Sequence, residues 1–221
     1  IGGIPMIQRV WQKAVNSKIG DVYVACSERE VYDLITSIGG SAILTDPNIP
    51  TGTDRIYAAS HEIKDLNKVD NIINLQGDMP LIKSEIIRKV LEPLYKSYSI
   101  GTLATTLQIE EIENPNITKV EVDLLNEDIG TAKNFFRLSN NISSKLFHHV
   151  GIYSYTRSSL SKFVKLPRSK NEINYKLEQF RAIDSNIEIG VTFTPNIPVS
   201  IDTKEDLITA ENIIRASNEK N

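Results

Sequence analysis

Two aspartates, Asp78 and Asp202, each follow a short apolar stretch of the chain. Residues 71–77 precede Asp78, and residues 199–201 precede Asp202. Such stretches are typical of buried strands, and open α/β sheets bind ligands at the carboxyl ends of their parallel strands. Carboxylates are natural ligands of Mg²⁺ where phosphate is close. We therefore predict that Asp78 and Asp202 converge on one Mg²⁺, which would neutralise the charge of a triphosphate.

Each aspartate also has a structural interpretation. Asp78 stands two residues before Pro80, and a strand that ends in an Asp/Pro turn needs no ligand. Thr203 and Asp206 form a capping pattern, so Asp202 could simply favour the amino end of a helix. Alone, the first motif leaves the two interpretations about equal, and the second favours the structural one.

A second polar motif, Thr51-Gly52-Thr53-Asp54-Arg55, has two hydroxyl groups and a glycine ahead of an expected helix. Thr53 can cap that helix. Arg55 falls in the first helical turn, where its charge opposes the helix dipole, so it suggests a ligand or a nearby acid. We weigh a binding role slightly above a purely structural cap.

Two further motifs are less specific. His148 and His149 lie on opposite faces of an expected strand, so at most one of them points toward any given site. Glu178 and Arg181 are spaced to form an i,i+3 pair on a helix, and a solvated helix face is the default interpretation of that pair.

Composition limits the classes of function. The chain has 221 residues, 40% of them hydrophobic and 24% charged, which fits one globular domain with a small subdomain. A net charge of −3 provides no basic field for nucleic acid, and no apolar run approaches the roughly 20 residues that span a membrane. The single cysteine, Cys26, excludes an internal disulfide and agrees with a cytoplasmic location. Motifs of P-loop, dinucleotide-binding, hydrolase-elbow and zinc-peptidase proteins are absent.

The hydrophobic pattern predicts an α/β protein. Helix and strand alternate up to residue 98, which favours a parallel sheet covered on both faces, whereas the strand-like segments after residue 100 suggest antiparallel or mixed pairing. The expected helices are 5–17, 28–38, 53–63, 84–98, 158–164, 172–183 and 203–216, and the expected strands are 21–26, 41–45, 71–76, 100–109, 118–125, 146–155, 187–193 and 199–201.

Five motifs occur in one order along nearly the whole chain: Thr51–Arg55, Asn74–Asp78, His149–Tyr153, Leu177–Arg181 and Ile201–Leu207. Together they resemble the 3-deoxy-manno-octulosonate cytidylyltransferases, also called CMP-Kdo synthetases. The resemblance implies a Rossmann-like nucleotide-diphospho-sugar transferase fold with a mostly parallel sheet and helices on both faces. It also implies one nucleotidyltransferase domain over residues 1–221, with an inserted antiparallel subdomain at about 110–155 through which the protein forms a homodimer.

The same resemblance implies the reaction of CTP with Kdo to give CMP-Kdo and pyrophosphate, for lipopolysaccharide synthesis, without a nucleic-acid or membrane partner. Carried over by motif, the site residues fall into three groups. The catalytic metal ligands for Mg²⁺ are Asp78 and Asp202, the nucleotide-binding residues are Thr51, Gly52, Thr53, Arg55 and Gln76, and the residues facing the sugar acid are His149, Tyr153, Glu178 and Gln179.

This sequence departs from the family pattern in several places. Family members begin with a strand and an Arg/Lys-containing loop that would precede Ile1, so we expect the chain as given to lack that nucleotide-binding loop and to be inactive alone. Other departures are Cys26, Ser27, Met79 and Tyr175. The alternatives are a related enzyme that acts on an acylneuraminate or another sugar acid, and a non-catalytic homologue that keeps the fold.

Overall fold

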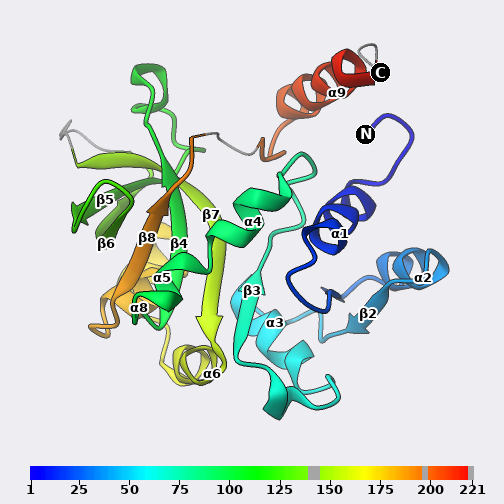
Figure 1. The fold of residues 1–221 in the computed structure, drawn as a ribbon, viewed down its shortest axis with the longest axis horizontal. Coiled ribbons are helices and arrows are strands. Elements are labelled where there is room, and N and C mark those ends of the chain that lie inside the picture. Colours follow the sequence, from blue (N-terminus) through cyan, green and yellow to red (C-terminus); the bar gives the residue numbers. More distant parts are fainter. Residues whose placement is uncertain (139–144, 196–198, 219–221) are drawn as a thin grey trace. The chain divides into compact units, whose positions relative to one another are not determined.

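The computed structural model describes residues 1–138, 145–195 and 199–218 (Figure 1). Its contacts divide the chain into two compact units. Unit 1 comprises Ile1–Asn48, Leu75–Arg88 and Pro198–Asn221, and unit 2 comprises Ile49–Asn74 and Lys89–Ile197. Within the described ranges, no helix is long and apolar enough to cross a membrane.

Unit 1 is built around a parallel strand pair. Its elements are α1 (Met6–Ser17), β1 (Tyr23–Cys26), α2 (Arg29–Ser37), β2 (Ser41–Leu44), most of α4 (Ser84–Lys89) and α9 (Lys204–Asn218). β1 pairs with β2 in parallel, and α2 connects the two strands and packs against both. The Trp11 ring of α1 lies so close to Gly40 that a Cβ there would approach it to 2.9 Å. The predictions of α1, β1, α2 and β2 are therefore confirmed.

Unit 2 contains the larger sheet. Its elements are α3 (Gly52–Ser60), η1 (Leu66–Lys68), β3 (Asn71–Asn74), α5 (Glu92–Tyr95), β4 (Ile100–Thr105), η2 (Ile109–Glu111), β5 (Lys119–Leu124), β6 (Ile129–Phe136), β7 (Leu146–Thr156), α6 (Arg157–Lys165), α7 (Lys170–Tyr175), α8 (Phe180–Ile183) and β8 (Ile189–Phe193). The strand order is β3-β7-β4-β8-β6-β5, and β5 also pairs with β7. Strands β7, β4, β8, β6 and β5 thus form a closed ring of pairings.

The sheet of unit 2 is mixed, so the prediction of a mostly parallel sheet is wrong here. Among its described pairings, β4–β8 is parallel and the others are antiparallel. The alternation of helix and strand predicted the elements but not their direction. β7 lies between β3 and β4, although it follows both in the sequence, and it runs antiparallel to each. The expectation of antiparallel or mixed pairing after residue 100 is confirmed.

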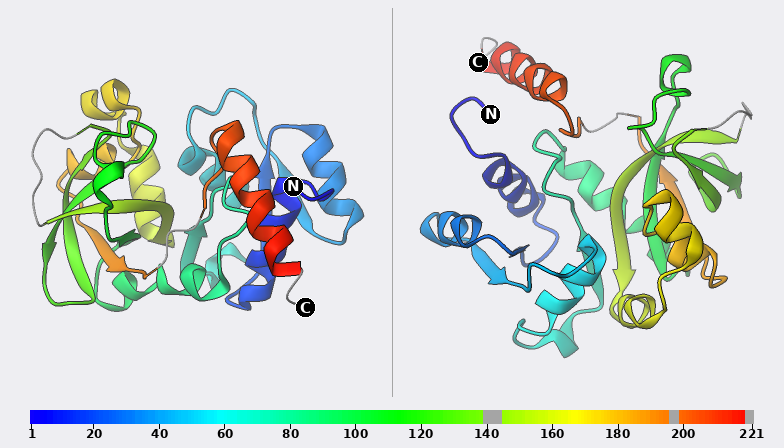
Figure 2. Two further views of the ribbon diagram at one scale, coloured as in Figure 1. Left: turned by 90° about the horizontal axis from the view of Figure 1, so that it is seen from above. Right: turned by 180° about the vertical axis from the view of Figure 1, so that it is seen from behind.

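Helices cover both faces of this sheet, as predicted. Successive residues of a strand point to opposite faces, and on β7 the Ser154 hydroxyl donates to the Val90 carbonyl oxygen while the Tyr155 ring contacts Phe163 of α6. Figure 1 shows α5 on one face, and the view from behind in Figure 2 shows the gold segment of α7 and α8 in front of the other.

Several element boundaries differ from the prediction. The expected helix 84–98 is split into α4 and α5, and the expected helix 172–183 is split at Lys176, whose φ is 54°. Residues 199–201 form no strand, and β6 was not foreseen. The second split matters most, because it removes Glu178 from a regular helix.

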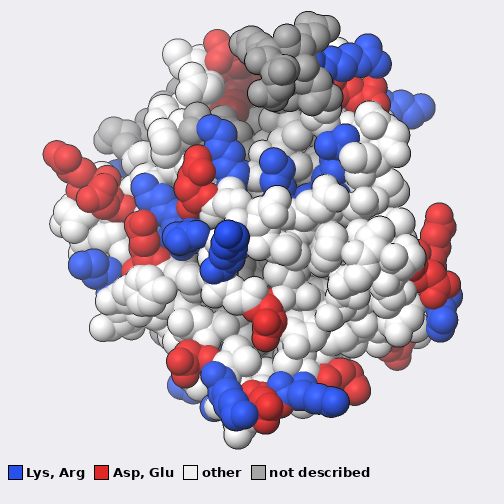
Figure 3. Space-filling view, turned by 45° about the vertical axis from the view of Figure 1, so that its right-hand side comes forward, with Lys and Arg blue, Asp and Glu red and all other residues white. Residues whose placement is uncertain are grey.

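Charged side chains are mixed in sign on the face that Figure 3 displays. Several lysine and arginine side chains lie near one another with a few acidic ones among them, and a broad uncharged area separates them from other mixed groups. This distribution agrees with the small net charge of −3.

A substitution at Gly190 tests the packing of unit 2. A Cβ at Gly190 would lie 2.6 Å from Pro93 Cβ and 2.6 Å from Tyr98 Cγ. We expect Gly190→Ala to lower the free energy of unfolding by about 1–3 kcal/mol through overpacking. Each kcal/mol corresponds to a Tm decrease of roughly 2–4 °C for a chain of this size. Thermal unfolding should show no such loss for the control Gly20→Ala, because nothing lies within 4 Å of a Cβ at Gly20.

Candidate active site

The predicted site residues fall into two groups, one in each unit. Asp78 and Asp202 belong to unit 1. Asp78 lies in the turn after β3, and Asp202 precedes α9. The Ile201 amide donates to the Asp78 carbonyl oxygen at 2.9 Å, and the Ser200 hydroxyl hydrogen-bonds the Asp78 carboxyl group. These contacts bring the two aspartates together from positions 124 residues apart (202 − 78).

The Asp78 carboxyl group is in an unfavourable environment for a negative charge. Its Oδ1 is buried and has no hydrogen-bond partner within the described part of the chain. Burial raises the pKa of Asp78, and the charge of Asp202 raises it further, while the Ser200 hydrogen bond only partly opposes these effects. A bound cation would relieve both the burial of charge and the repulsion between the carboxylates.

The donor set at this position suits Mg²⁺ better than zinc. No group of three or more His, Cys, Asp and Glu side chains that could hold a metal occurs among the described residues. Mg²⁺ is commonly held by one or two carboxylates and completes its octahedron with water and substrate phosphate. Two aspartates, one with a buried and unsatisfied oxygen, fit that pattern.

The predicted capping pattern of Thr203 and Asp206 is confirmed. Asp206 Oδ2 accepts hydrogen bonds from the amides of Asp202 and Thr203, at 3.1 and 2.8 Å. The Thr203 hydroxyl accepts from the Asp206 amide at 3.2 Å. The amino end of α9 is therefore capped by Thr203 and Asp206, and the side chain of Asp202 is left exposed.

In unit 2, the amino end of α3 is capped by Thr51 and not by Thr53 as predicted. Thr51 Oγ1 accepts from the Asp54 amide at 3.1 Å and donates to Asp54 Oδ2 at 2.8 Å. Thr53 is buried, its hydroxyl accepts from Asn74 Nδ2 at 3.3 Å, and it hydrogen-bonds Tyr155. Thr53 thus connects α3 to the sheet.

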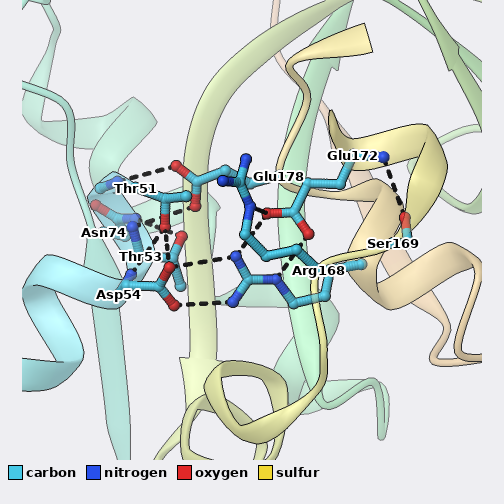
Figure 4. Close-up of polar contacts among 10 residues, drawn as sticks. Thr51, Thr53, Asp54, Asn74, Arg168, Ser169, Glu172 and Glu178 are labelled. Atoms are coloured by element: carbon cyan, nitrogen blue, oxygen red, sulfur yellow. Dashed lines mark hydrogen bonds and ion pairs between the residues drawn. The ribbon is translucent and has the colours of Figure 1, made fainter. Parts of the chain in front are cut away.

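Glu178 binds the amino end of α3 directly. Its carboxylate accepts from the Gly52 amide at 3.0 Å and from the Thr53 amide at 3.2 Å (Figure 4). Helix amino ends carry amides without intrahelical partners and a partial positive charge, so a carboxylate is a favourable partner. The interpretation of Glu178 as part of a solvated helical turn is wrong, because the helix is interrupted at Lys176 and turns this side chain toward α3.

Arg181 joins two carboxylates in the interior of unit 2. Nε and Nη2 donate to Glu172 at 2.9 and 2.6 Å, and Nη1 and Nη2 donate to Asp54 at 2.8 and 3.2 Å. Arg181 and Glu172 are each only 1% exposed, and the guanidinium group lies over the Phe163 ring. Burial acts against the charge of Arg181, but the hydrogen bonds to Glu172 and Asp54 outweigh it and raise the pKa of Arg181. The predicted i,i+3 pair of Arg181 with Glu178 is replaced by this cluster.

His149 is a buried and neutral imidazole. Its Nε2 lies 2.9 Å from Thr102 Oγ1, and the same hydroxyl donates to the Ile152 carbonyl oxygen at 2.9 Å. If the hydroxyl proton serves that carbonyl, Nε2 carries the imidazole proton and Nδ1 is an acceptor. Burial, with a smaller effect of His148, lowers the pKa of His149 to about 3. His148 is instead paired with Glu111 at 3.1 Å.

Tyr153 continues a row of ring contacts along β7. Its ring centroid lies 5.5 Å from that of His149 and 6.2 Å from that of Tyr155. The Tyr153 hydroxyl is buried, and burial raises its pKa, while an interaction with the Thr102 side chain opposes that effect only in part. A neutral hydroxyl beside a neutral imidazole is suited to a polar, uncharged part of a ligand.

Three predicted residues remain to be described, namely Arg55, Gln179 and Gln76. Arg55 is half-buried and donates to the Ile49 carbonyl oxygen at 3.5 Å. Gln179 is buried beside Glu178, and Gln76 belongs to the turn after β3 in unit 1. Unit 2 therefore brings the motifs that contain Thr53, Tyr153 and Glu178 into one cluster.

The sequence patterns did not identify three residues of the hydrogen-bonded cluster around Arg181. Asp54 belonged to a selected motif but was given no role, and Glu172 and Arg168 were not selected at all. Arg168 Nε donates to Glu172 Oε1 at 3.0 Å. The one local signal was Ser169-x-x-Glu172, in which the serine hydroxyl accepts from the Glu172 amide at 3.0 Å.

Comparisons with known proteins relate this chain to cytidylyltransferases. A model of the cytidylyltransferase family matches residues 1–189. A 3-deoxy-manno-octulosonate cytidylyltransferase from Paramagnetospirillum magneticum is 38% identical over 220 residues, which are 98% of this chain and 89% of the relative. Another of that name, from Rickettsia typhi, is 39% identical over 209 residues, with 94% and 85% covered.

Solved structures show the same likeness. A CMP:2-keto-3-deoxy-manno-octonic acid synthetase complexed with CTP superposes with a TM-score of 0.87 at 28% identity, covering 97% of this chain and 89% of that one. A UDP-glucose pyrophosphorylase complexed with UDP-glucose gives a TM-score of 0.65 at 13% identity over 96% and 87%, a likeness of fold alone. The fold is therefore of the nucleotidyltransferase α/β type, with a mixed sheet.

The unfavourable electrostatic environment of the Asp78 carboxylate predicts that a neutral side chain at this position stabilises the protein. Because its pKa is raised in the folded protein, the ionised carboxyl group lowers stability as the pH rises through that pKa. We expect Asp78→Asn to have a higher Tm than wild type at pH 7 without metal, with the advantage lost below about pH 4, where aspartate is protonated. Thermal unfolding across pH, with Asp21→Asn as an exposed control, measures this. An equal Tm at pH 7 would contradict this unfavourable environment.

The buried His149 predicts the opposite dependence on pH. Its pKa falls from 6.5 to about 3 on folding, so below pH 6.5 the unfolded chain binds a proton that the folded chain does not. As the pH falls from 6.5 towards 3, the free energy of unfolding should therefore decrease by up to about 1.4 kcal/mol per pH unit. Urea unfolding at pH 7, 5.5 and 4.5 should show a smaller loss for His149→Gln, while the exposed-site control His61→Gln keeps the acid sensitivity of wild type.

Proposed function

Since the chain belongs to the cytidylyltransferase family, we propose that it joins CTP to the sugar acid Kdo and forms CMP-Kdo and pyrophosphate, a step of lipopolysaccharide synthesis. The observation that carries the proposal is the 38% identity, over 98% of the chain, to a 3-deoxy-manno-octulosonate cytidylyltransferase. The likeness at TM-score 0.87 to a synthetase complexed with CTP supports the nucleotide. Both curated relatives described above are named for the same sugar acid, 3-deoxy-manno-octulosonate.

The proposed reaction is a direct displacement at phosphorus. The anomeric hydroxyl oxygen of Kdo forms a bond to the α-phosphorus of CTP, the bond from that phosphorus to the bridging oxygen breaks, and pyrophosphate leaves. The hydroxyl proton passes to solvent. Such a reaction depends mainly on the positioning of the two substrates and on neutralisation of phosphate charge.

We assign Asp78 and Asp202 to a Mg²⁺ ion. Bound there, the ion would supply charge neutralisation and orientation of the phosphates. The support is the buried and unsatisfied Oδ1 of Asp78 and the raised pKa that the neighbouring Asp202 helps to cause. Asp78 and Asp202 would share the negative charge that retains the ion, and Ser200 would hold the Asp78 carboxyl group in orientation.

On the sugar side, we assign His149, Tyr153, Glu178 and Gln179 to the binding of Kdo. His149 is neutral, so it is suited to a sugar hydroxyl and does not neutralise the Kdo carboxylate. Its low pKa also makes it a poor proton acceptor at neutral pH. Tyr153 offers a buried hydroxyl that stays neutral because burial raises its pKa.

On the nucleotide side, we assign Thr51, Gly52, Thr53, Arg55 and Gln76 to the CTP site. The amides of Gly52 and Thr53 and the hydroxyls of Thr51 and Thr53 are already hydrogen-bonded within the protein. This turn would therefore contribute the shape of its backbone and the Arg55 side chain to the nucleotide site. It would not contribute free hydroxyl groups. We further propose that the enzyme acts as a homodimer in the cytoplasm, as the resemblance implies.

Pyrophosphate release tests the function. The protein expressed from its complete gene should release pyrophosphate from CTP when Kdo and Mg²⁺ are present. Omitting Kdo should abolish release, and N-acetylneuraminate should replace Kdo poorly. Faster release with N-acetylneuraminate would make the related sugar-acid enzyme the better conclusion. No release with any sugar acid, from protein shown to be folded, would favour a non-catalytic homologue.

Substitution of the aspartates tests the metal assignment. Asp78→Asn and Asp202→Asn should each lower kcat/KM by roughly 100-fold or more, since even outer-sphere metal partners contribute 10- to 100-fold. Both should also lose the rise in Tm that Mg²⁺ with CTP gives to wild type. Asp21→Asn, at an exposed position of the same unit, should retain both properties. Wild-type activity in either variant would exclude that residue as a ligand.

A further inference from the structure

Two sets of hydrogen bonds tie the turn Thr51–Arg55 to the segment Leu177–Arg181. The Glu178 carboxylate accepts from two amides at the start of α3, and the Arg181 guanidinium group donates twice to Asp54 in the first turn of that helix. The partners are 125 to 127 residues apart in the sequence. All of these residues belong to unit 2.

The segment Leu177–Arg181 has little regular structure of its own to fix its position. It follows Lys176, which has a left-handed backbone with φ of 54°, and it leads into α8, which has only four residues. The side-chain ties at Glu178 and Arg181, together with the burial of Leu177 and Phe180 in the core, therefore hold Gln179 in place between them. Arg181 is also held from the other side by Glu172 of α7.

Stability alone is a weak reason for such a cluster. A buried ion pair loses hydration that its mutual attraction often fails to repay, and neutral replacements of similar volume are frequently as stable. What the guanidinium group provides is geometry, because its planar fork binds two carboxylates at once in fixed directions. Arg181 contacts Asp54 and Glu172 through both edges of that fork, at 2.6 to 3.2 Å.

We infer that Arg181 is a positioning residue that, together with Glu178, couples the nucleotide segment Thr51–Arg55 to the sugar-acid segment Leu177–Arg181. Binding of the nucleotide and binding of the sugar acid are then thermodynamically linked, each favouring the arrangement that the other needs. The inference rests on the proposed function, which assigns the two segments to the two substrates.

The linkage is measured with CMP and Kdo, a pair that undergoes no displacement because CMP carries no pyrophosphate leaving group. Calorimetric titration gives the Kd of each ligand with and without the other. Wild type should bind each ligand at least about 5-fold more tightly in the presence of the other, at the lower end of common coupling factors. By reciprocity, the two factors must agree.

Because Arg181→Met would leave Asp54 without its cation and the buried Glu172 with Arg168 alone, the test uses the neutral triple variant Asp54→Asn/Glu172→Gln/Arg181→Met. We expect this variant, once shown to be folded by its Tm, to have a coupling factor near 1. Arg168→Gln is the matched control, because Arg168 donates to the same Glu172 carboxylate but is 42% exposed. It should keep the wild-type factor.

A second variant separates the role of Glu178 from that of a simple sugar ligand. Glu178→Gln weakens the two charge-assisted bonds to α3. It should therefore raise the Kd of CMP alone as well as that of Kdo alone. A change confined to Kdo would overturn the tie to the nucleotide segment.

The inference and the proposed function fail in different ways. A wild-type coupling factor of 1, or an unchanged factor in the folded triple variant, overturns the inference while pyrophosphate release from CTP and Kdo continues. Absence of pyrophosphate release from wild type would instead remove the proposed function on which the inference rests.

Discussion

The antiparallel pairing of β7 with β3, β4 and β5 constrains most of unit 2. One half of this eleven-residue strand lies between β3 and β4, and the other half lies between β4 and β5. Where its register against β4 shifts, after Thr102, the threonine hydroxyl contacts the carbonyl oxygens of Val150 and Ile152 as well as His149. Bulges of this kind often redirect side chains beside functional sites. The row of His149, Tyr153 and Tyr155 follows from it.

The two groups of site residues treat buried charge in opposite ways. In unit 2, the charge of Arg181 is matched by Asp54 and Glu172, through hydrogen bonds of 2.6 to 3.2 Å. In unit 1, Asp78 keeps a buried oxygen unsatisfied beside a second carboxylate. Buried charges that are fully hydrogen-bonded stabilise one arrangement of the surrounding chain. A buried carboxylate oxygen without a partner destabilises the protein until a ligand binds it, so binding is favoured. This contrast separates the positioning residues from those proposed to bind the metal.

Local patterns in the sequence predicted local structure well. Apolar spacing was enough for α1, β1, α2 and β2, because each of these elements is defined by its own residues. The direction of β7 and its insertion between β3 and β4 depend on pairing with distant strands, which no local pattern records. The same holds for Arg181, whose partner Asp54 lies 127 residues away. Asp78 and Asp202 were selected because each follows an apolar stretch, although residues 199–201 form no strand.

The amino end of α3 is synthesised well before the residue that hydrogen-bonds its amides. The Gly52 amide finds the carboxylate of Glu178 only after 126 further residues have been added. At translation rates of about 5–20 residues per second, that interval lasts roughly 6 to 25 seconds. Until then, two amides of this helix must be hydrated by water. The turn Thr51–Arg55 therefore matures late on the ribosome, after most of the sheet beside it has been made.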